Sequence, residues 1–260
     1  MTRRILRFLA LLLVAIALTI SFRFWVLSGA IAQNRPSLLV SAAISLKDVL
    51  EEIKPLYKPA NLTYNLGASG ALQQQIEQGA PVDVFLSAGK KQMDALESKG
   101  LLAPGTRANL ATNKLVLIVP NDSKAGITGF SSLTNGNVKR IAVGEPRSVP
   151  AGQYAAQVFQ NLGIAEKVKS KLVLANNVRQ VLAAVTAGNA DAGVVYLTDA
   201  KTTNKVTIVA TASESSHSPI VYPIAVIKAS KNLAAATDFT RFLSTNQAKA
   251  ILRKYGFIVK

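Results

Sequence analysis

From residue 37 onward, short apolar runs alternate with segments of helical periodicity, and this alternation restricts the possible folds more than any other feature. The run Ser37–Ala43 has the length of a buried strand, and Leu46, Val49, Leu50 and Ile53 follow it at helical spacing. Strands separated by helices in this way form right-handed βαβ units around a parallel sheet. Two further units are predicted, with strands at 62–66 and 82–88, with one helix that begins at Ser69 and stops at Gly79, and with another at 90–99 that stops at Gly100.

A second α/β series begins after the apolar run 114–120, and we expect it to be inserted into the first. Its elements are predicted at 140–144, 172–175, 193–197, 206–211 and 221–228 for strands and at 151–162, 178–187, 234–243 and 247–255 for helices. We assign residues 37–117 and 220–260 to lobe 1 and residues 118–219 to lobe 2, with crossovers near 115–120 and 219–227.

The predicted fold class is therefore α/β with two lobes, each a mostly parallel sheet flanked by helices. Ligands of open α/β sheets bind beyond the carboxyl ends of the strands. The cleft between the lobes is therefore the predicted binding site.

The first 32 residues have the pattern of an export signal. Three arginines lie within the first seven residues, an apolar core follows at 8–20, and Ala30-Ile31-Ala32 has the form of a cleavage site. The alternative is an uncleaved membrane anchor, because residues 24–27 restore hydrophobicity after Arg23. With no cysteine in the sequence, a lipid-modified N-terminal cysteine and a disulfide framework are both excluded. We therefore expect a periplasmic protein.

The chain is strongly basic, with a formal charge of +16. Loss of residues 1–32 would remove four arginines and leave +12. The basic residues are scattered, and neither an aromatic-rich basic strand nor a basic helix accompanies them, so no nucleic-acid partner is expected. A cationic surface of this kind could instead steer small anions toward a cleft.

Two predicted helices begin at a serine that follows a strand and small residues. Ser45 opens one, with Asp48 placed to complete a capping box, and Ser69 opens the other. Each serine could simply cap its helix. However, a helix N-terminus also presents free N–H groups and a partial positive charge, and a hydroxyl can donate its own proton to an anion. Two such ends indicate a cleft for a small oxyanion.

The segment Gly67–Ala71 nearly matches the nucleophile elbow of hydrolases, but Ala71 replaces the last glycine. A triad of Ser69, Asp199 and His217 would have the chain order of a secreted serine hydrolase. We disfavour this alternative, because His217 would have to be delivered to Ser69 across the chain. No metal-ligand spacing, Walker loop or dinucleotide fingerprint is present, so neither an enzyme nor a cofactor is expected.

Three features of the predicted second lobe could also face the cleft. Helices are predicted to begin at Pro150-Ala151 and at Val178, the latter with Asn177 as its N-cap. Tyr196 ends a strand, where its side chain could belong to the core or point its hydroxyl into the cleft.

The ordered set SAAISL, GASGALQQQIEQGAPVDVFLSA, VGEPRSVPAGQYA, NNVRQVLAAV, AGVVY and KYGF resembles the periplasmic molybdate-binding proteins of ABC importers, from about residue 38 to 260. The resemblance implies a class II periplasmic binding protein that delivers molybdate, and also tungstate, to a membrane permease as a monomer. It implies ligand contacts through the hydroxyl and amide of Ser45 and Ser69, the amides of Ala151 and Val178, and the phenol of Tyr196. Molybdenum would be present only in the bound oxyanion, with no direct protein–metal ligands.

Two positions depart from that family's pattern, which usually has Asp at Glu145 and often at Asn177. Neither change removes a proposed donor. Every implied contact is a donor, which suits a bare dianion and disfavours a protonated phosphate. A binding protein for another small anion, such as sulfate, is the alternative within the same class.

Overall fold

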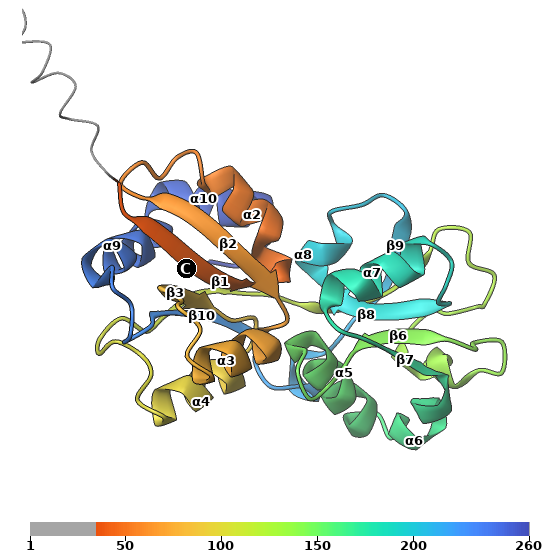
Figure 1. Cartoon of the computed structure of the whole chain (residues 1–260). Helices are drawn as coiled ribbons and strands as arrows, with labels where there is room; N and C mark the ends of the chain where they lie inside the picture. Colours follow the sequence, from red (N-terminus) through yellow and green to blue (C-terminus); the bar gives the residue numbers. More distant parts are fainter. Residues whose placement is uncertain (1–34, 260) are drawn as a thin grey trace, which may run out of the picture. The chain divides into compact units, whose positions relative to one another are not determined.

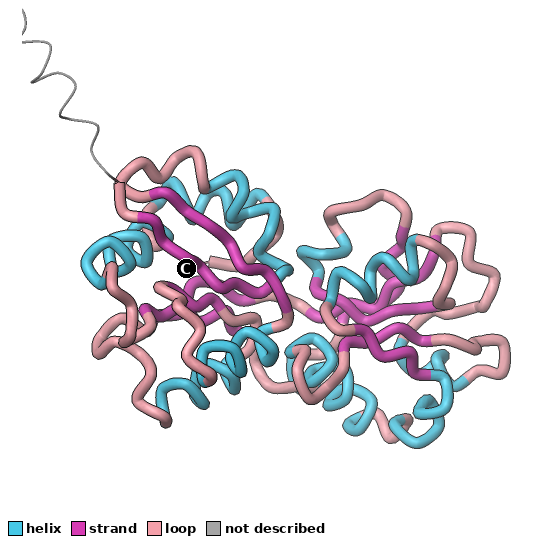
Figure 2. Tube along the Cα trace, in the orientation of Figure 1, coloured by secondary structure: helices cyan, strands magenta, loops and turns pink. Residues whose placement is uncertain are grey.

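The computed structural model describes residues 35–259, which form two five-stranded mixed sheets with helices on their faces (Figures 1 and 2). The predicted export signal, residues 1–32, lies outside the described residues. Within residues 35–259, no helix combines the length and the hydrophobicity needed to cross a membrane.

The first sheet has the strand order β2-β1-β3-β10-β4. β1 pairs in parallel with both β2 and β3, whereas β10 pairs antiparallel with β3 and β4. Its bounds are β1 Ser37–Ala43, β2 Asn61–Gly67, β3 Val84–Leu86, β4 Ala108–Thr112 and β10 Val221–Val226.

The second sheet has the order β7-β6-β8-β5-β9 and the same division of pairings. β6 pairs in parallel with β7 and β8, and β5 pairs antiparallel with β8 and β9. In each sheet four of the five strands run in the same direction, and only β10 in the first sheet and β5 in the second run against them, so each sheet is mostly parallel, as predicted. Its bounds are β5 Leu115–Pro120, β6 Ile141–Gly144, β7 Leu172–Ala175, β8 Ala192–Tyr196 and β9 Val206–Thr211.

Helices cover both faces of each sheet. α3 and α4 pack on one face of the first sheet, while α2, α9 and α10 lie on the other; α5 and α7 cover opposite faces of the second sheet (Figure 1). The predicted stop signals at Gly79 and Gly100 are confirmed by their positive φ angles of 86° and 66°, which cost glycine little. The helices are α2 Lys47–Ile53, α3 Ser69–Glu77, α4 Lys90–Ser98, α5 Pro150–Asn161, α6 Ala165–Val168, α7 Val178–Thr186, α8 Leu197–Ala200, α9 Leu233–Leu243 and α10 Asn246–Lys254, and the 3-10 turns are η1 Ile44–Leu46, η2 Phe130–Thr134, η3 Lys169–Lys171 and η4 Glu214–Ser216.

The chain changes sheet twice, once at Asn113-Lys114 between β4 and β5 and once through residues 212–220 between β9 and β10. The predicted end of lobe 1 at residue 117 falls inside β5, all of whose pairings are in the second sheet. The division into two separately moving lobes remains a prediction. The carboxyl ends of β1 and β2 on one side, and of β6 and β7 on the other, each lead toward a helix start, and these starts define the site.

Candidate functional site

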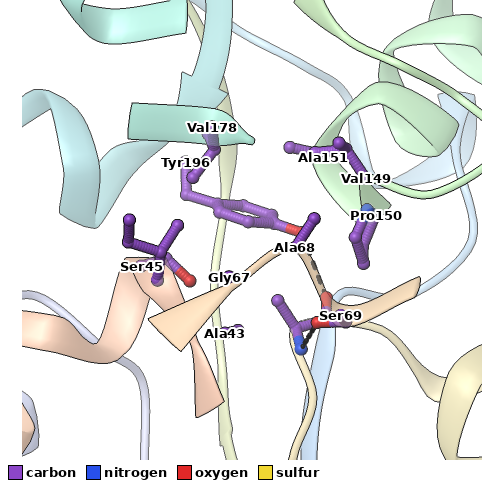
Figure 3. Close-up of a pocket in the computed structure, with 12 residues that line it drawn as sticks. Ala43, Ser45, Gly67, Ala68, Ser69, Val149, Pro150, Ala151, Val178 and Tyr196 are labelled. Atoms are coloured by element: carbon purple, nitrogen blue, oxygen red, sulfur yellow. Dashed lines mark hydrogen bonds between the residues drawn. The ribbon is translucent and has the colours of Figure 1, made fainter. Parts of the chain in front are cut away.

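A small pocket lies where the helix starts of the two sheets meet, and all five residues expected to contact a ligand line it (Figure 3). Its volume is about 10 Å³, which is roughly the space of one water-sized group. None of its lining side chains is charged. The lining residues are Ala43, Ile44, Ser45, Gly67, Ala68, Ser69, Ala88, Val149, Pro150, Ala151, Val178 and Tyr196.

Ser45 reaches the pocket from a 3-10 turn rather than from a helix N-cap. The turn η1 follows β1 directly, and α2 begins only at Lys47, with Leu46 at its N-cap position. The predicted capping box is therefore wrong, because the extra turn separates Ser45 from the helix start. Instead, the Ser45 hydroxyl lies 3.0 Å from the hydroxyl of Tyr222. Figure 3 shows the Ser45 oxygen pointing into the pocket.

Ser69 is the first residue of α3, behind the N-cap position Ala68. Its hydroxyl oxygen accepts a hydrogen bond from the Ala88 amide at 2.9 Å. Because a hydroxyl has a single proton and the oxygen here accepts, that proton stays available for a ligand. Ser69 is fully buried, so the pocket is the direction in which it can donate.

Gly70 brings the two sheets together beside Ser69. Its amide donates to the Ser148 carbonyl at 2.9 Å, which links α3 to the segment before α5. A Cβ on Gly70 would lie 2.5 Å from that carbonyl oxygen, so any side chain would push the two segments apart. The close approach therefore requires glycine at this position.

On the second sheet's side, the donors are backbone amides at two helix N-termini. α5 begins with Pro150 at its first position, which leaves the Ala151 amide without a partner inside the helix. In α7 the Asn177 side chain accepts from the Gln180 amide, so this cap leaves the Val178 amide free for the pocket. Both helices also direct their positive dipole ends there.

Tyr196, at the end of β8, joins the two sides of the pocket. Its hydroxyl donates to the Ala88 carbonyl at 3.0 Å, across from the second sheet to the first. The side chain is almost fully buried, and burial raises its pKa well above the ordinary value, so the phenol keeps its proton. A single phenol proton cannot serve both Ala88 and a ligand at full strength. A ligand contact by Tyr196 would therefore compete with this hydrogen bond.

Beside the pocket, Arg179 lies between two carboxylates. Its Nε donates to Asp199 at 2.5 Å and its Nη2 donates to Asp48 at 2.6 Å. The guanidinium therefore connects α2, which packs with the first sheet, to α8, which follows β8 of the second. Asp199 is fully buried, and burial raises its pKa to about 6, although Arg179 opposes the shift. Only a fifth of the Arg179 side chain is exposed.

The hydrolase alternative does not assemble. His217 lines no part of the pocket, and its Nδ1 lies 2.8 Å from the Ser218 carbonyl. Asp199 pairs with Arg179, and Ser69 accepts from Ala88. Within the described range 35–259, no group of three His, Cys, Asp or Glu residues could hold a metal ion.

Residues 38–258 match the model of a family described as bacterial extracellular solute-binding proteins. The chain belongs to this family. Its members bind a solute and do not transform it, so the expectation of a non-enzyme is confirmed. Membership also places the protein outside the cytoplasm, which agrees with the coarser part of the predicted localisation.

Individual relatives narrow the comparison. A Bacillus subtilis protein, provisionally named the ABC transporter substrate-binding lipoprotein YvgL, is 41% identical over 87% of this chain and 88% of its own. The molybdate-binding protein ModA of Escherichia coli is 37% identical over 90% and 95%. The solved periplasmic molybdate-binding protein of Azotobacter vinelandii superposes with a TM-score of 0.77 at 27% identity, covering 86% and 99%. The predicted family and fold class are confirmed.

Three residues near the pocket were missed by the sequence analysis, namely Ala88, Asn113 and Tyr222. Ala88 is the last residue of the run GAPVDVFLSA, and no local pattern indicates that its amide donates to Ser69 and that its carbonyl accepts from Tyr196. Tyr222 lies 177 residues from Ser45 in the sequence, and no local pattern indicates that pairing.

Proposed function

We propose that this protein captures molybdate, and also tungstate, and delivers it to the membrane permease of an ABC importer. The observation that carries the proposal is a small pocket with hydroxyl and amide donors from both sheets and no charged lining side chain. The proposed contacts are Ser45, Ser69, Ala151, Val178 and Tyr196. Relatives named for molybdate binding, at 37% identity over most of the chain, support the choice of ligand.

The chemistry of the donors favours a fully deprotonated oxyanion. Molybdate is a bare dianion near neutral pH, whereas phosphate still carries a proton that needs an acceptor. A pocket of donors leaves that proton unpaired, which costs about 1–3 kcal/mol for a buried group. Neutral donors and helix N-termini stabilise the charge without a cationic side chain.

The size of the pocket bears on both entry and selectivity. The pocket has space for about one water-sized group, so we propose that the two lobes part for a ligand to enter and adjust to hold it. Sulfate has the same charge and shape but is smaller than molybdate, so its rejection depends on the fit of the closed pocket. Closure is favoured only by contacts that the ligand makes with both lobes.

The remaining parts of the proposal concern the setting of the protein. We propose a periplasmic monomer, released by cleavage after Ala32, that presents its closed form to the permease. The sequence contains no cysteine, so the lipid attachment implied by the name of the Bacillus subtilis relative has no acceptor residue in this sequence.

Isothermal titration with molybdate, tungstate, sulfate and phosphate tests the ligand directly. We expect tight binding of the first two, with sulfate and phosphate at least a hundredfold weaker. A ligand at a thousand times its Kd adds about 4 kcal/mol to the free energy of unfolding. For a chain of this size, that corresponds to a rise of about 8–16 °C in the thermal midpoint. Binding of sulfate with equal or greater affinity would overturn the molybdate assignment and favour the other anion class.

A further inference from the structure

Tyr222 and Asn113 lie behind Ser45 and form a buried hydrogen-bond chain that starts at the first crossover. Asn113 Nδ2 lies 2.9 Å from Thr198 Oγ1 and 3.3 Å from the Tyr222 hydroxyl, which in turn lies 3.0 Å from Ser45 Oγ. All four side chains are less than a tenth exposed. Neither Tyr222 nor Asn113 lines the pocket, so any effect on a ligand must pass through residues that do, namely Ser45 or the Tyr196 ring that Tyr222 contacts.

The backbone fixes the orientation of the Asn113 amide. The Lys114 N–H donates to Asn113 Oδ1 at 2.9 Å, so Oδ1 is the acceptor end and Nδ2 is the donor end. The two Nδ2 protons then point at Thr198 and at Tyr222. The Tyr222 oxygen is therefore an acceptor toward Asn113.

The direction of the next hydrogen bond follows from this one. Among residues 35–259, the Tyr222 hydroxyl has two partners, Asn113 and Ser45. Since Asn113 donates to it, the phenol proton is left to donate, and Ser45 Oγ lies 3.0 Å away. Burial raises the pKa of Tyr222 well above its ordinary value, so this proton is not lost at any physiological pH. Edge contacts with Tyr196 and Phe257, at 5.6 and 5.2 Å between ring centres, hold the ring in place.

We infer that Tyr222, oriented by Asn113, is a positioning residue that fixes the Ser45 hydroxyl as a donor toward the ligand and so enforces selection of fully deprotonated oxyanions. This inference rests on the proposed function. With its oxygen accepting from Tyr222, Ser45 directs its own proton into the pocket. Ser69 reaches the same polarity by accepting from the Ala88 amide. Both hydroxyls then act as donors toward the pocket, so the proton of a protonated ligand oxygen finds no acceptor in either of them.

The test is the ratio of Kd values for hydrogen phosphate and molybdate, measured by calorimetry at pH 7 for Tyr222→Phe. Without the phenol, Ser45 can rotate and accept, so molybdate affinity should fall about threefold to tenfold, as for one neutral hydrogen bond. The affinity for phosphate should fall less or rise, so the ratio of the two Kd values should decrease by about tenfold. Tyr57→Phe is the matched control, because its buried hydroxyl binds Asp238 away from the pocket, and it should leave the ratio unchanged.

A double-mutant cycle separates this role from a general packing effect. In a Ser45→Ala background, Tyr222→Phe should change the ratio by less than twofold, because Tyr222 acts through Ser45. The inference would be overturned if Tyr222→Phe lowered the Kd ratio equally in both backgrounds, or did not lower it in the wild-type background. Either result would leave molybdate binding itself intact. If Tyr222→Phe does not fold, Asn113→Ala gives the same test with a smaller decrease expected. Failure of the wild type to bind molybdate would instead count against the proposed function.

Discussion

The two sides of the pocket supply donors of different kinds. The first sheet contributes the side-chain hydroxyls of Ser45 and Ser69 beside their amides, whereas the second contributes the backbone amides of Ala151 and Val178 and one phenol, that of Tyr196, which already donates to Ala88. An amide can only donate, and no side-chain substitution changes that. A hydroxyl donates or accepts according to its other partner, so its polarity has to be imposed by neighbouring groups.

If the protein binds an oxyanion as proposed, this difference gives the two sides separate roles in recognising it. The amides of Ala151 and Val178 would always favour a negatively charged ligand, and their positions depend on how the backbone packs. The hydroxyls of Ser45 and Ser69 would select for the protonation state of the ligand. That selection depends on the hydrogen bonds from Ala88 and Tyr222 that orient the two hydroxyls. Substitutions on the two sides should therefore fail in different ways.

Gly152→Ala should break the amide side and give the largest effect. A Cβ at this position would lie 1.9 Å from the Gly144 carbonyl oxygen, which is backbone, so α5 must shift together with the Ala151 amide. We expect more than a hundredfold loss of molybdate affinity, with a lower thermal midpoint. Gly136→Ala is the control, because nothing lies within 4 Å of its added Cβ. Wild-type affinity in Gly152→Ala would mean that the α5 amide is not a ligand contact.

Ser69→Ala and Ser45→Ala each remove one donor from the hydroxyl side. A hydrogen bond to a charged group is worth about 1.5–3 kcal/mol, so Kd should weaken by about 10- to 150-fold in calorimetry. Ser69→Ala should also lower the thermal midpoint, since it leaves the Ala88 amide unpaired. The exposed Ser98, which bonds only to Ala95, provides the control Ser98→Ala. Unchanged affinity in both pocket variants would remove the serines from the site.

The variant Asp199→Asn tests how the stability of the protein depends on pH through Asp199, which pairs with Arg179 next to the Val178 amide. The folded-state pKa of about 6 lies above the ordinary value of 3.8, because the buried carboxylate is poorly solvated. The folded protein therefore binds the proton more tightly than the unfolded chain. This contribution to stability is complete below about pH 4 and is lost as the pH rises through 6.

The thermal midpoint of the wild type relative to Asp199→Asn should accordingly fall between pH 4 and pH 7. Comparing the two proteins at each pH removes contributions that they share. A difference that stays constant over this range would show that Asp199 titrates normally.

Asp48→Asn should give the smallest effect, because it weakens an ion pair that joins the two sides without touching the pocket. The Asp48 carboxylate is about a third exposed, so its pair with Arg179 is screened and worth at most about 1 kcal/mol. We expect dissociation of molybdate to speed up by no more than fivefold, with association unchanged, in stopped-flow measurements. Glu51→Gln, an exposed change on the same helix, should alter neither rate. An equal acceleration in both variants would indicate a general charge effect.

Local patterns predicted most of the fold, and tertiary contacts account for what they missed. The strands Leu172–Ala175 and Val206–Thr211 were predicted with their observed bounds, because both are short β-rich runs between clear breaks. The strand Ala108–Thr112 was missed, since its sequence ANLAT has neither alternation nor a strongly apolar run. Its pairing with β10 joins segments that are distant in the chain, and local periodicity carries no such information.

The candidate site divides in the same way. Residues at element boundaries, such as Ser69 and Val178, could be chosen because helix starts have local signals. The residues that contact or orient them could not be predicted. Arg179 pairs with Asp48, 131 residues away in the sequence, and the direction of the hydrogen bond at Ser45 depends on Asn113. These interactions exist only once the two sheets are in contact.

The buried tyrosines beside the pocket give the protein an optical probe of its own. Tyr154, Tyr196 and Tyr222 pack edge to face in a row, and they are three of the six tyrosines in the chain. The single tryptophan, Trp25, lies before residue 33. A chain that begins at residue 33 therefore emits in the ultraviolet from tyrosine alone, and half of its fluorophores surround the site. We expect ligand capture to change this emission, which would report binding without an attached dye.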